Sequence, residues 1–403
     1  MTLPASGAMS LSANVQYEIS QTTGSQISLG GSDVRTLYGV SSGAIRLAAD
    51  GYGKTNAYKI VVLGQGGSRD VWCSYDGISF TKFTNALPAA CTVITYCNGL
   101  FVAAGYTGAA AAVYYSTNGS TWSTGSADHY GYPDSITTDG SSIVLMTYFI
   151  QGSGGYIGVS RSTDGGRNFT KVTIQGDGQH IVNITGNFTG SGRLAYAPGS
   201  GTGTSGGNYL ISPNTISKPT VYATNNGGST WTTGGTTPAL GGSAVVSSVA
   251  SHTTGTFVAA VNNQSTLSQV LRTTDSGATW ATATTTTIGG GIGWVSITFG
   301  NGIYILGGPM NPGSPYNNVG AYSTTGASST WTQFSFPNPG VNPQWFPNWV
   351  PSLNKFIAFG MYGTNTYAAL SPSGWNGSGS WSTVNTISTS SPVFGGPYTV
   401  AVR

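Results

Sequence analysis

Short runs of aliphatic and aromatic residues alternate with small polar residues along most of the chain. The pattern is clearest in NGLFVAAG (98–105) and NGIYILGG (301–308), and TGTFVAAV (254–261) and NKFIAFG (354–360) repeat it. Such runs are typical of short β-strands, and the segments between them are rich in Gly, Ser, Thr and Asn, which favour tight turns. The pattern therefore predicts an all-β protein without long helices.

One unit recurs seven times from residue 71 onward: a strand-like run, a polar turn that contains glycine, and an aromatic residue that closes the turn. The spacings between closing aromatics are 42, 47, 62, 49, 51 and 50 residues. Several copies carry an earlier strand as well, so each unit holds about four short strands, as a propeller blade does. We predict a β-propeller of about seven four-stranded blades over residues 55–403, preceded by a small irregular segment, residues 1–54. The closing aromatics are Phe80, Trp122, Phe169, Trp231, Trp280, Trp331 and Trp381.

The turns resemble the Asp box of BNR-type propellers, in which Ser/Thr, Asp, Gly and Trp/Phe follow one another at fixed spacing. STDGGRNF (162–169) and TTDSGATW (273–280) fit closely, whereas the other copies are shorter, longer or lack the Asp. The resemblance implies structural roles: the acidic or amide side chain accepts backbone N–H groups, Gly166 and Gly277 take a positive φ, and Phe169 and Trp280 wedge between sheets. The box positions hold Asp76, Asn118, Asp164, Asn226 and Asp275.

The two ends of the repeat region predict how the ring closes. A propeller must join its first and last blades, because exposed sheet edges otherwise remain. The first blade begins near Tyr58 with YKIVVLG and lacks an opening strand, while SPVFGGPYTVAVR (391–403) offers further strand after the seventh turn. We expect the C-terminal segment to complete the first blade.

The chain has few charged residues, which argues against some classes of function. Only 6% of the residues are charged, and the net charge of +3 comes from 14 basic and 11 acidic residues without a Lys/Arg cluster, so nucleic-acid binding is not expected. No apolar stretch reaches 18 residues and the N-terminus has no signal-peptide core, so we expect neither a membrane span nor ordinary secretion. Cys73, Cys91 and Cys97 do not make a disulfide framework or a usual zinc spacing, and we expect buried free thiols.

Residues 1–54 do not share the repeat and are too few for a core of their own. Their strings LPASGAMSLS, ISL, VRTLYGVSSGAI and GYGK resemble, in order, an N-terminal module of tailed-phage virion proteins. The resemblance implies docking onto a particle, other virion proteins as partners, synthesis in the host cytoplasm, and a homo-oligomer, with a trimer suggested by analogy with tail fibres. The alternative is a tail or strand pair that packs on its own propeller. The candidate docking residues are Leu3, Ile27, Leu29, Val34, Leu37 and Ile45.

Asp boxes also occur in sialidases, which are enzymes. A sialidase-like site pairs a Tyr nucleophile with a Glu and uses three arginines, but Glu18 is the one glutamate of the chain and lies outside the repeats. An ordinary glycosidase needs two facing carboxylates, and the repeats supply only Asp. His129, His180 and His252 show no spacing that would bring two onto one metal. We expect no catalytic residue, metal or cofactor, with a carbohydrate-active enzyme as the least favoured alternative.

Recognition by aromatic and polar loops is the remaining chemistry, and it suits sugars such as a bacterial surface polysaccharide. The string NPGVNPQWFPNWVP (338–351) predicts a rigid extended loop that presents its rings. Two alternatives stay open: the rings close the propeller core or an oligomer contact, or the protein is a capsid, neck or tail decoration protein without a ligand. The candidate ligand-binding residues are Trp294, Tyr316, Trp345, Trp349, Tyr130 and Tyr132.

Overall fold

The chain divides into two compact units, residues 1–58 and 59–403. The six candidate docking residues, Tyr130 and Tyr316 lie outside the described residues. The computed structural model describes residues 57–65, 68–108, 111–128, 131–150, 156–172, 182–183, 192–197, 208–213, 220–236, 245–253, 255–262, 269–284, 293–308, 318–377, 379–382, 384–388 and 399–403.

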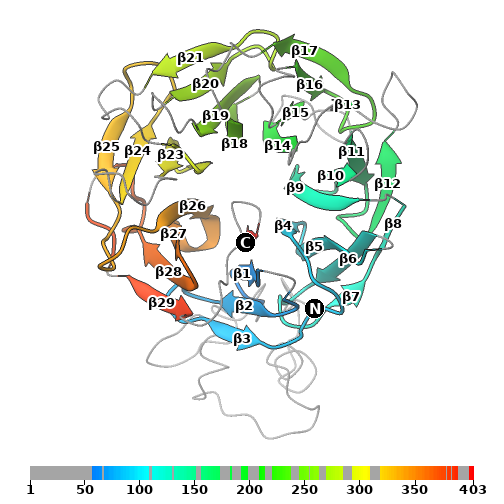
Figure 1. Cartoon of the computed structure of the whole chain (residues 1–403), viewed down its shortest axis with the longest axis horizontal. Coiled ribbons are helices and arrows are strands. Elements are labelled where there is room, and N and C mark those ends of the chain that lie inside the picture. Colours follow the sequence, from blue (N-terminus) through cyan, green and yellow to red (C-terminus); the bar gives the residue numbers. More distant parts are fainter. Residues whose placement is uncertain are drawn as a thin grey trace, which may run out of the picture. The chain divides into compact units, whose positions relative to one another are not determined.

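Within the second unit, seven sheets stand around a common axis as the blades of a β-propeller, and all are antiparallel apart from one short pairing in blade 3 (Figure 1). This confirms the predicted fold. We number the blades in chain order. Blade 1 contains β1 (Ile60–Leu63), β2 (Val71–Ser74) and β3 (Thr81–Phe83), and blade 2 contains β4 (Val93–Cys97), β5 (Leu100–Tyr106), β6 (Ala111–Ser116) and β7 (Ser123–Thr124). Blade 3 contains β9 (Tyr132–Thr138), β10 (Val144–Ile150), β11 (Tyr156–Ser162) and β12 (Asn168–Val172).

The remaining four blades each have four strands in sequence order. Blade 4 contains β14 (Gly192–Ala197), β15 (Asn208–Pro213), β16 (Thr220–Thr224) and β17 (Thr232–Thr236), and blade 5 contains β18 (Val245–Thr253), β19 (Thr256–Asn262), β20 (Gln269–Thr273) and β21 (Ala281–Thr284). Blade 6 contains β22 (Ser296–Gly300), β23 (Ile303–Gly307), β24 (Val319–Ser323) and β25 (Thr332–Ser335). Blade 7 contains β26 (Gln344–Val350), β27 (Lys355–Tyr362), β28 (Asn365–Leu370) and β29 (Asn385–Ser388).

The C-terminal strand closes the ring, as the sequence predicted. Strand β30 (Val400–Val402) pairs antiparallel with β1, with Val61 opposite Ala401. Hydrogen bonds extend the pairing at both ends, from the Leu63 N–H to the Thr399 carbonyl (2.9 Å) and from the Arg403 N–H to the Lys59 carbonyl (2.8 Å). The last residues of the chain thus supply the inner strand of blade 1.

Blade 3 differs from the expected four strands. Strand β8 (Ser126–Ala127) runs parallel to β12 at the outer edge, and β13 (Val182–Asn183) pairs with β11 beyond the end of β12. The extra strand β13 follows Phe169, within the longest spacing between closing aromatics, where the chain has residues to spare. Strand β8 covers the β12 edge, which would otherwise expose unpaired backbone groups.

The core lies between blades, where the closing aromatics are buried. Phe169 packs against Val102 of β5 and Met146 of β10, so it joins blades 2 and 3. Trp280 likewise packs with Ala195 of blade 4 and Leu271 of blade 5. Burying a large apolar side chain contributes about 1.5–3 kcal/mol, so these wedges hold neighbouring sheets together. Trp231, Trp331 and Trp381 are buried in equivalent clusters, Phe80 packs partly buried against another, and Trp122 is half-buried.

The described residues contain no α-helix; their one helical element is a 3-10 turn, η2 (Pro351–Leu353), between β26 and β27. Within that same part of the chain, no helix is long and apolar enough to cross a membrane.

Candidate functional site

The box turn of blade 3 is held by two side chains. The Ser162 hydroxyl accepts the Gly166 N–H (2.9 Å) and donates to Asp164 Oδ1 (2.7 Å), which also accepts the N–H groups of Arg167 (2.9 Å) and Asn168 (3.0 Å). Gly166 has a φ of 96°. The carboxylate therefore satisfies its own turn, as expected.

The boxes of blades 2, 4 and 5 keep this geometry with different residues. Asp275 Oδ1 accepts the Thr279 N–H (2.8 Å), and Gly277 has a φ of 90°. Where Asn replaces Asp, the amide oxygen accepts the backbone N–H in place of the carboxylate. Asn118 Oδ1 accepts the Thr121 N–H (3.0 Å), and Asn226 Oδ1 accepts the Thr230 N–H (3.0 Å). The chain is an Asp-box-type β-propeller.

The electrostatics of two box carboxylates fit this structural role. Burial raises the pKa of Asp164, but hydrogen bonds from Ser162, Asn168 and Arg167 outweigh burial and hold that pKa below its usual value. For Asp275, hydrogen bonds from Thr279 and Thr273 likewise outweigh burial and lower the pKa. Both groups stay ionised at neutral pH, so neither is suited to act as a general acid.

Outside the boxes, the described aspartates are also held by neighbours. Asp139 Oδ1 accepts three successive backbone N–H groups, from residues 141 to 143. Asp70 accepts the Asn85 N–H (2.8 Å) and forms an ion pair with Lys82 (2.9 Å). The remaining contacts are Asp76 with the Ile78 and Ser79 N–H groups, Asp128 with the Lys171 N–H, and Asp134 with Arg193.

The three cysteines are free and buried, as the sequence predicted. Burial raises the pKa of the thiols of Cys73, Cys91 and Cys97, so each stays protonated at neutral pH. Protonated thiols are poor nucleophiles and poor metal ligands. In the described part of the chain, no three His, Cys, Asp or Glu side chains gather as a metal site would require.

The prediction of an extended aromatic loop over residues 338–351 is wrong for its second half, because residues 344–350 form strand β26. This strand pairs with β27 from Gln344 to Val350, and Pro347 fits there because β26 is an inner edge strand that needs fewer ladder donors. Trp345 is fully buried and donates from Nε1 to Asn318 Oδ1 (3.0 Å). Trp349 is half-buried against the Phe356 ring (4.7 Å between centroids).

Trp294 is also fully buried, two residues before the start of β22. Its partners include Val258 of blade 5 and Tyr304 of blade 6. Trp294 and Trp345 therefore fill the propeller core, as the alternative interpretation predicted. Neither ring is exposed, so neither can contact a sugar.

Tyr132 is the surface-exposed member among the described candidates. It lies at the start of β9 with 44% of its surface exposed, and its ring contacts Tyr106 with 4.5 Å between centroids. The Tyr106 hydroxyl donates to the Gly108 carbonyl (3.0 Å), which fixes the supporting ring. The pair forms a small aromatic surface whose role as a ligand site stays a prediction.

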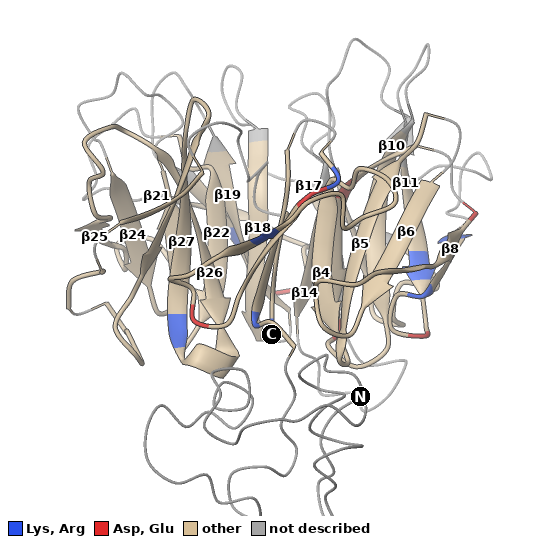
Figure 2. Ribbon diagram, turned by 90° about the horizontal axis from the view of Figure 1, so that it is seen from below, with Lys and Arg blue, Asp and Glu red and all other residues tan. Residues whose placement is uncertain are grey.

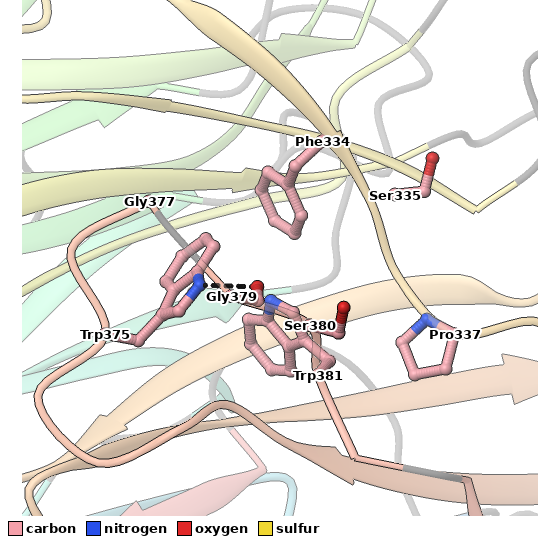
Figure 3. A pocket seen from close by; sticks show the side chains of 8 residues that line it. All are labelled: Phe334, Ser335, Pro337, Trp375, Gly377, Gly379, Ser380 and Trp381. Atoms are coloured by element: carbon pink, nitrogen blue, oxygen red, sulfur yellow. Dashed lines mark hydrogen bonds between the residues drawn. The ribbon is translucent and has the colours of Figure 1, made fainter.

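A pocket of about 300 Å³ lies elsewhere, between the outer strand of blade 6 and the box turn of blade 7 (Figure 3). Blade 6 contributes the end of β25 and the residues after it, and blade 7 contributes the turn between β28 and β29. The volume is at the lower end of the range of small-molecule sites. The lining residues are Phe334, Ser335, Pro337, Trp375, Gly377, Gly379, Ser380 and Trp381.

Three aromatic rings line this pocket: Phe334 is half-buried, while Trp375 and Trp381 are buried, with 2% and 9% of their surface exposed. The rings of Phe334 and Trp381 are nearly parallel, at 7° and with 6.0 Å between centroids, while Trp375 meets Phe334 at 63° and 5.1 Å. Trp375 Nε1 donates to the Gly379 carbonyl (3.1 Å), as Figure 3 shows. Trp381 Nε1 is buried and has no partner among the residues that the structure describes.

Sequence reasoning assigned Trp381 to the core and did not single out Phe334 or Trp375. The signal was the box SPSGWNGSGSW (371–381), the longest of the seven copies and the one with two tryptophans. In the blade 2 and blade 5 boxes, the closing Trp donates to a glycine carbonyl three residues earlier. The insertion in the last box changes this arrangement and leaves space beside the rings.

Comparisons with known proteins agree on the fold. No protein-family model matches the sequence, and no curated protein is a detectable relative. A GH74 xyloglucanase from Xanthomonas campestris is similar in structure, with a TM-score of 0.51 and 16% identity over 81% of this chain and 46% of that enzyme. This chain therefore spans about half of the enzyme's length, and a likeness at this identity shows the fold alone.

Two further solved structures are similar over a large share of the chain. YCF48 from Cyanidioschyzon merolae has a TM-score of 0.46 and 16% identity over 76% of this chain and 94% of its own. NanB sialidase from Streptococcus pneumoniae has a TM-score of 0.42 and 12% identity over 66% of this chain and 64% of its own.

Proposed function

We propose that this chain is a non-enzymatic structural protein of a tailed-phage particle, similar to a tail fibre or spike. Its propeller contacts host-surface glycan or neighbouring virion proteins. The observation that carries the non-enzymatic part is the state of the carboxylates: every described Asp binds its own turn, a neighbouring strand or a basic side chain. A hydrolase needs two carboxylates that face one substrate bond, and these groups are engaged elsewhere.

The particle part of the proposal is supported by the strings in residues 1–54, which resemble a phage docking module. The low density of charge suits a propeller that is displayed on the surface of a particle. The few Lys, Arg and Asp residues are scattered over the described blades (Figure 2). Such a surface resists non-specific electrostatic adsorption. Several copies on one particle would make weak single-site binding effective through avidity.

Particle assembly tests the docking role directly. The encoding phage is grown with the tagged chain or with a variant that lacks residues 1–54, and the tag is measured on purified particles. We expect the full chain on particles and the shortened chain in the unbound fraction. A thermal melt of the shortened chain checks that its propeller is folded. Equal incorporation of both chains would overturn the docking role.

Glycan binding separates the attachment role from the alternative role as a decoration protein. A glycan array probed with the full chain is expected to show binding to bacterial surface polysaccharide, whereas a decoration protein without a ligand shows none. Release of reducing ends from a bound polysaccharide would overturn the non-enzymatic assignment.

A further inference from the structure

The pocket between blades 6 and 7 carries a more specific inference, which rests on the proposed glycan-recognition function. Its rings touch one another, since the three centroid separations lie between 5.1 and 6.0 Å. Rings in mutual contact leave no space between them for a ligand, so they form a wall and not a cage. A ligand must lie along this wall.

The rim of the pocket is polar and small. Gly377 and Gly379 both have a positive φ, and a Cβ added to Gly377 would lie 2.3 Å from the Tyr322 ring, so the turn at this rim requires glycine. Ser335 and Ser380 are exposed, one on each side of the pocket, and their hydroxyls have no partner among the described residues. The pocket thus offers hydroxyl donors and acceptors at its edge and aromatic surface inside.

The lining contains no Lys, Arg, Asp or Glu. An acidic sugar would bury its carboxylate without a partner, and a quaternary ammonium ion would lack both a surrounding cage and a counter-charge. A neutral pyranose avoids both costs, because one face of its ring is made of C–H groups and its edge carries hydroxyls. A volume of about 300 Å³ suits a small ligand of this kind.

We propose that Phe334, backed by the buried rings of Trp375 and Trp381, forms with Ser335 and Ser380 at the rim a binding site for one neutral pyranose unit of a surface glycan. The site lies between the outer parts of two blades, away from the inner strands β22 and β26.

The test uses the full chain and saturation-transfer NMR with methyl glucopyranoside and methyl galactopyranoside, with glucuronate and choline as charged probes. We expect saturable binding of a neutral glycoside with a Kd on the order of millimolar, as suits a ligand of this size. The charged probes should bind at least about tenfold more weakly. Absence of neutral-glycoside binding, or tighter binding of glucuronate or choline, would overturn the proposal.

Variants locate the binding. Ser380→Trp fills the pocket from blade 7 and should weaken binding at least about tenfold, and Ser335→Trp repeats the test from blade 6 if the first variant does not fold. Gln333→Trp adds the same ring at an exposed position of β25 outside the pocket and should leave Kd within about twofold. Binding that survives both pocket-filling variants would place the sugar elsewhere and refute this site.

The two proposals can fail separately. A chain that binds glycosides through this pocket but is not found on particles refutes the virion role alone. Conversely, a chain that is incorporated into particles but does not bind a neutral glycoside refutes the pocket alone.

Discussion

Gly166 of the blade 3 box lies directly against Val102 on β5 of blade 2, and a Cβ added to Gly166 would lie 2.5 Å from Val102 Cγ2. The same relationship recurs around the ring: Gly228 faces Leu145, and Gly326 faces Val258, each at 2.5 Å from the added Cβ. These three box turns therefore press a glycine onto the second strand of the preceding blade. The box is a contact between blades as well as a turn.

Replacing this glycine should loosen the contact between blades 2 and 3. Gly166→Ala combines a positive φ, which costs about 1–2 kcal/mol, with overpacking, which costs about 1–3 kcal/mol. We expect the free energy of unfolding in urea to fall by roughly 2–5 kcal/mol. Gly165→Ala is the matched control, because its φ is 78° but its added Cβ meets nothing closer than 3.7 Å.

A double-mutant cycle identifies the cause. Val102→Ala removes the two methyl groups nearest to the added Cβ. Gly166→Ala should therefore cost at least about 1 kcal/mol less in the Val102→Ala background, since contacting residues are non-additive. Additive losses would show that the close approach to Val102 does not explain the requirement for glycine.

Ring closure predicts a cooperative effect of the C-terminus. Deleting residues 399–403 removes β30 and exposes the β1 edge that pairs with it. We expect loss of a single sharp thermal transition and aggregation of the shortened chain, because an unpaired strand edge promotes association between chains. A monomeric truncated protein with an unchanged melting curve would contradict closure through β30.

The two kinds of box predict which substitutions the turns tolerate. Asn226 Nδ2 donates to Thr230 Oγ1, at the position where the Asp275 carboxylate accepts from Thr279 Oγ1. Asp275→Asn should therefore copy the native blade 4 box and cost less than about 1 kcal/mol at pH 7. Asp275→Ala loses the acceptor and should cost about 1–2 kcal/mol. Chemical denaturation of both variants measures the difference, and equal losses would refute the equivalence of the two boxes.

Acid stability should depend on Asp164 and Asp275. Their pKa values are lower in the folded chain than the ordinary value of 3.8. A carboxyl of this kind stabilises the fold above pH about 4 and loses that contribution as the pH falls through its folded pKa. As the pH is lowered from about 5 to about 2, the denaturant concentration at the unfolding midpoint should decrease for the wild type. It should decrease less for the Asp164→Asn/Asp275→Asn double variant. Parallel profiles would contradict this assignment.

Local spacing explains why the fold was predictable and the surface was not. The box positions and closing aromatics recur at regular spacing along the sequence, so the sequence alone predicts the buried places of Phe169 and Trp280. Burial of Trp345 depends on which face of β26 meets the next blade, and the string around it contains enough Pro to resemble a loop. The pocket at Phe334 joins two blades through residues about 40–50 apart, and no local pattern shows that contact.

The burial of Trp345 and the exposure of Tyr132 predict opposite consequences for alanine substitution. Trp345→Ala leaves a cavity, frees Asn318 Oδ1 and removes a ring stacked on Phe336 at 5.3 Å, so unfolding should become easier by about 3–5 kcal/mol. Tyr132→Ala removes an exposed ring and should change stability by less than about 1 kcal/mol. If the Tyr106–Tyr132 surface contacts glycan, Tyr132→Ala weakens binding on a glycan array while its urea midpoint matches the wild type. Unchanged array binding would exclude this surface, and a wild-type midpoint for Trp345→Ala would contradict its place in the core.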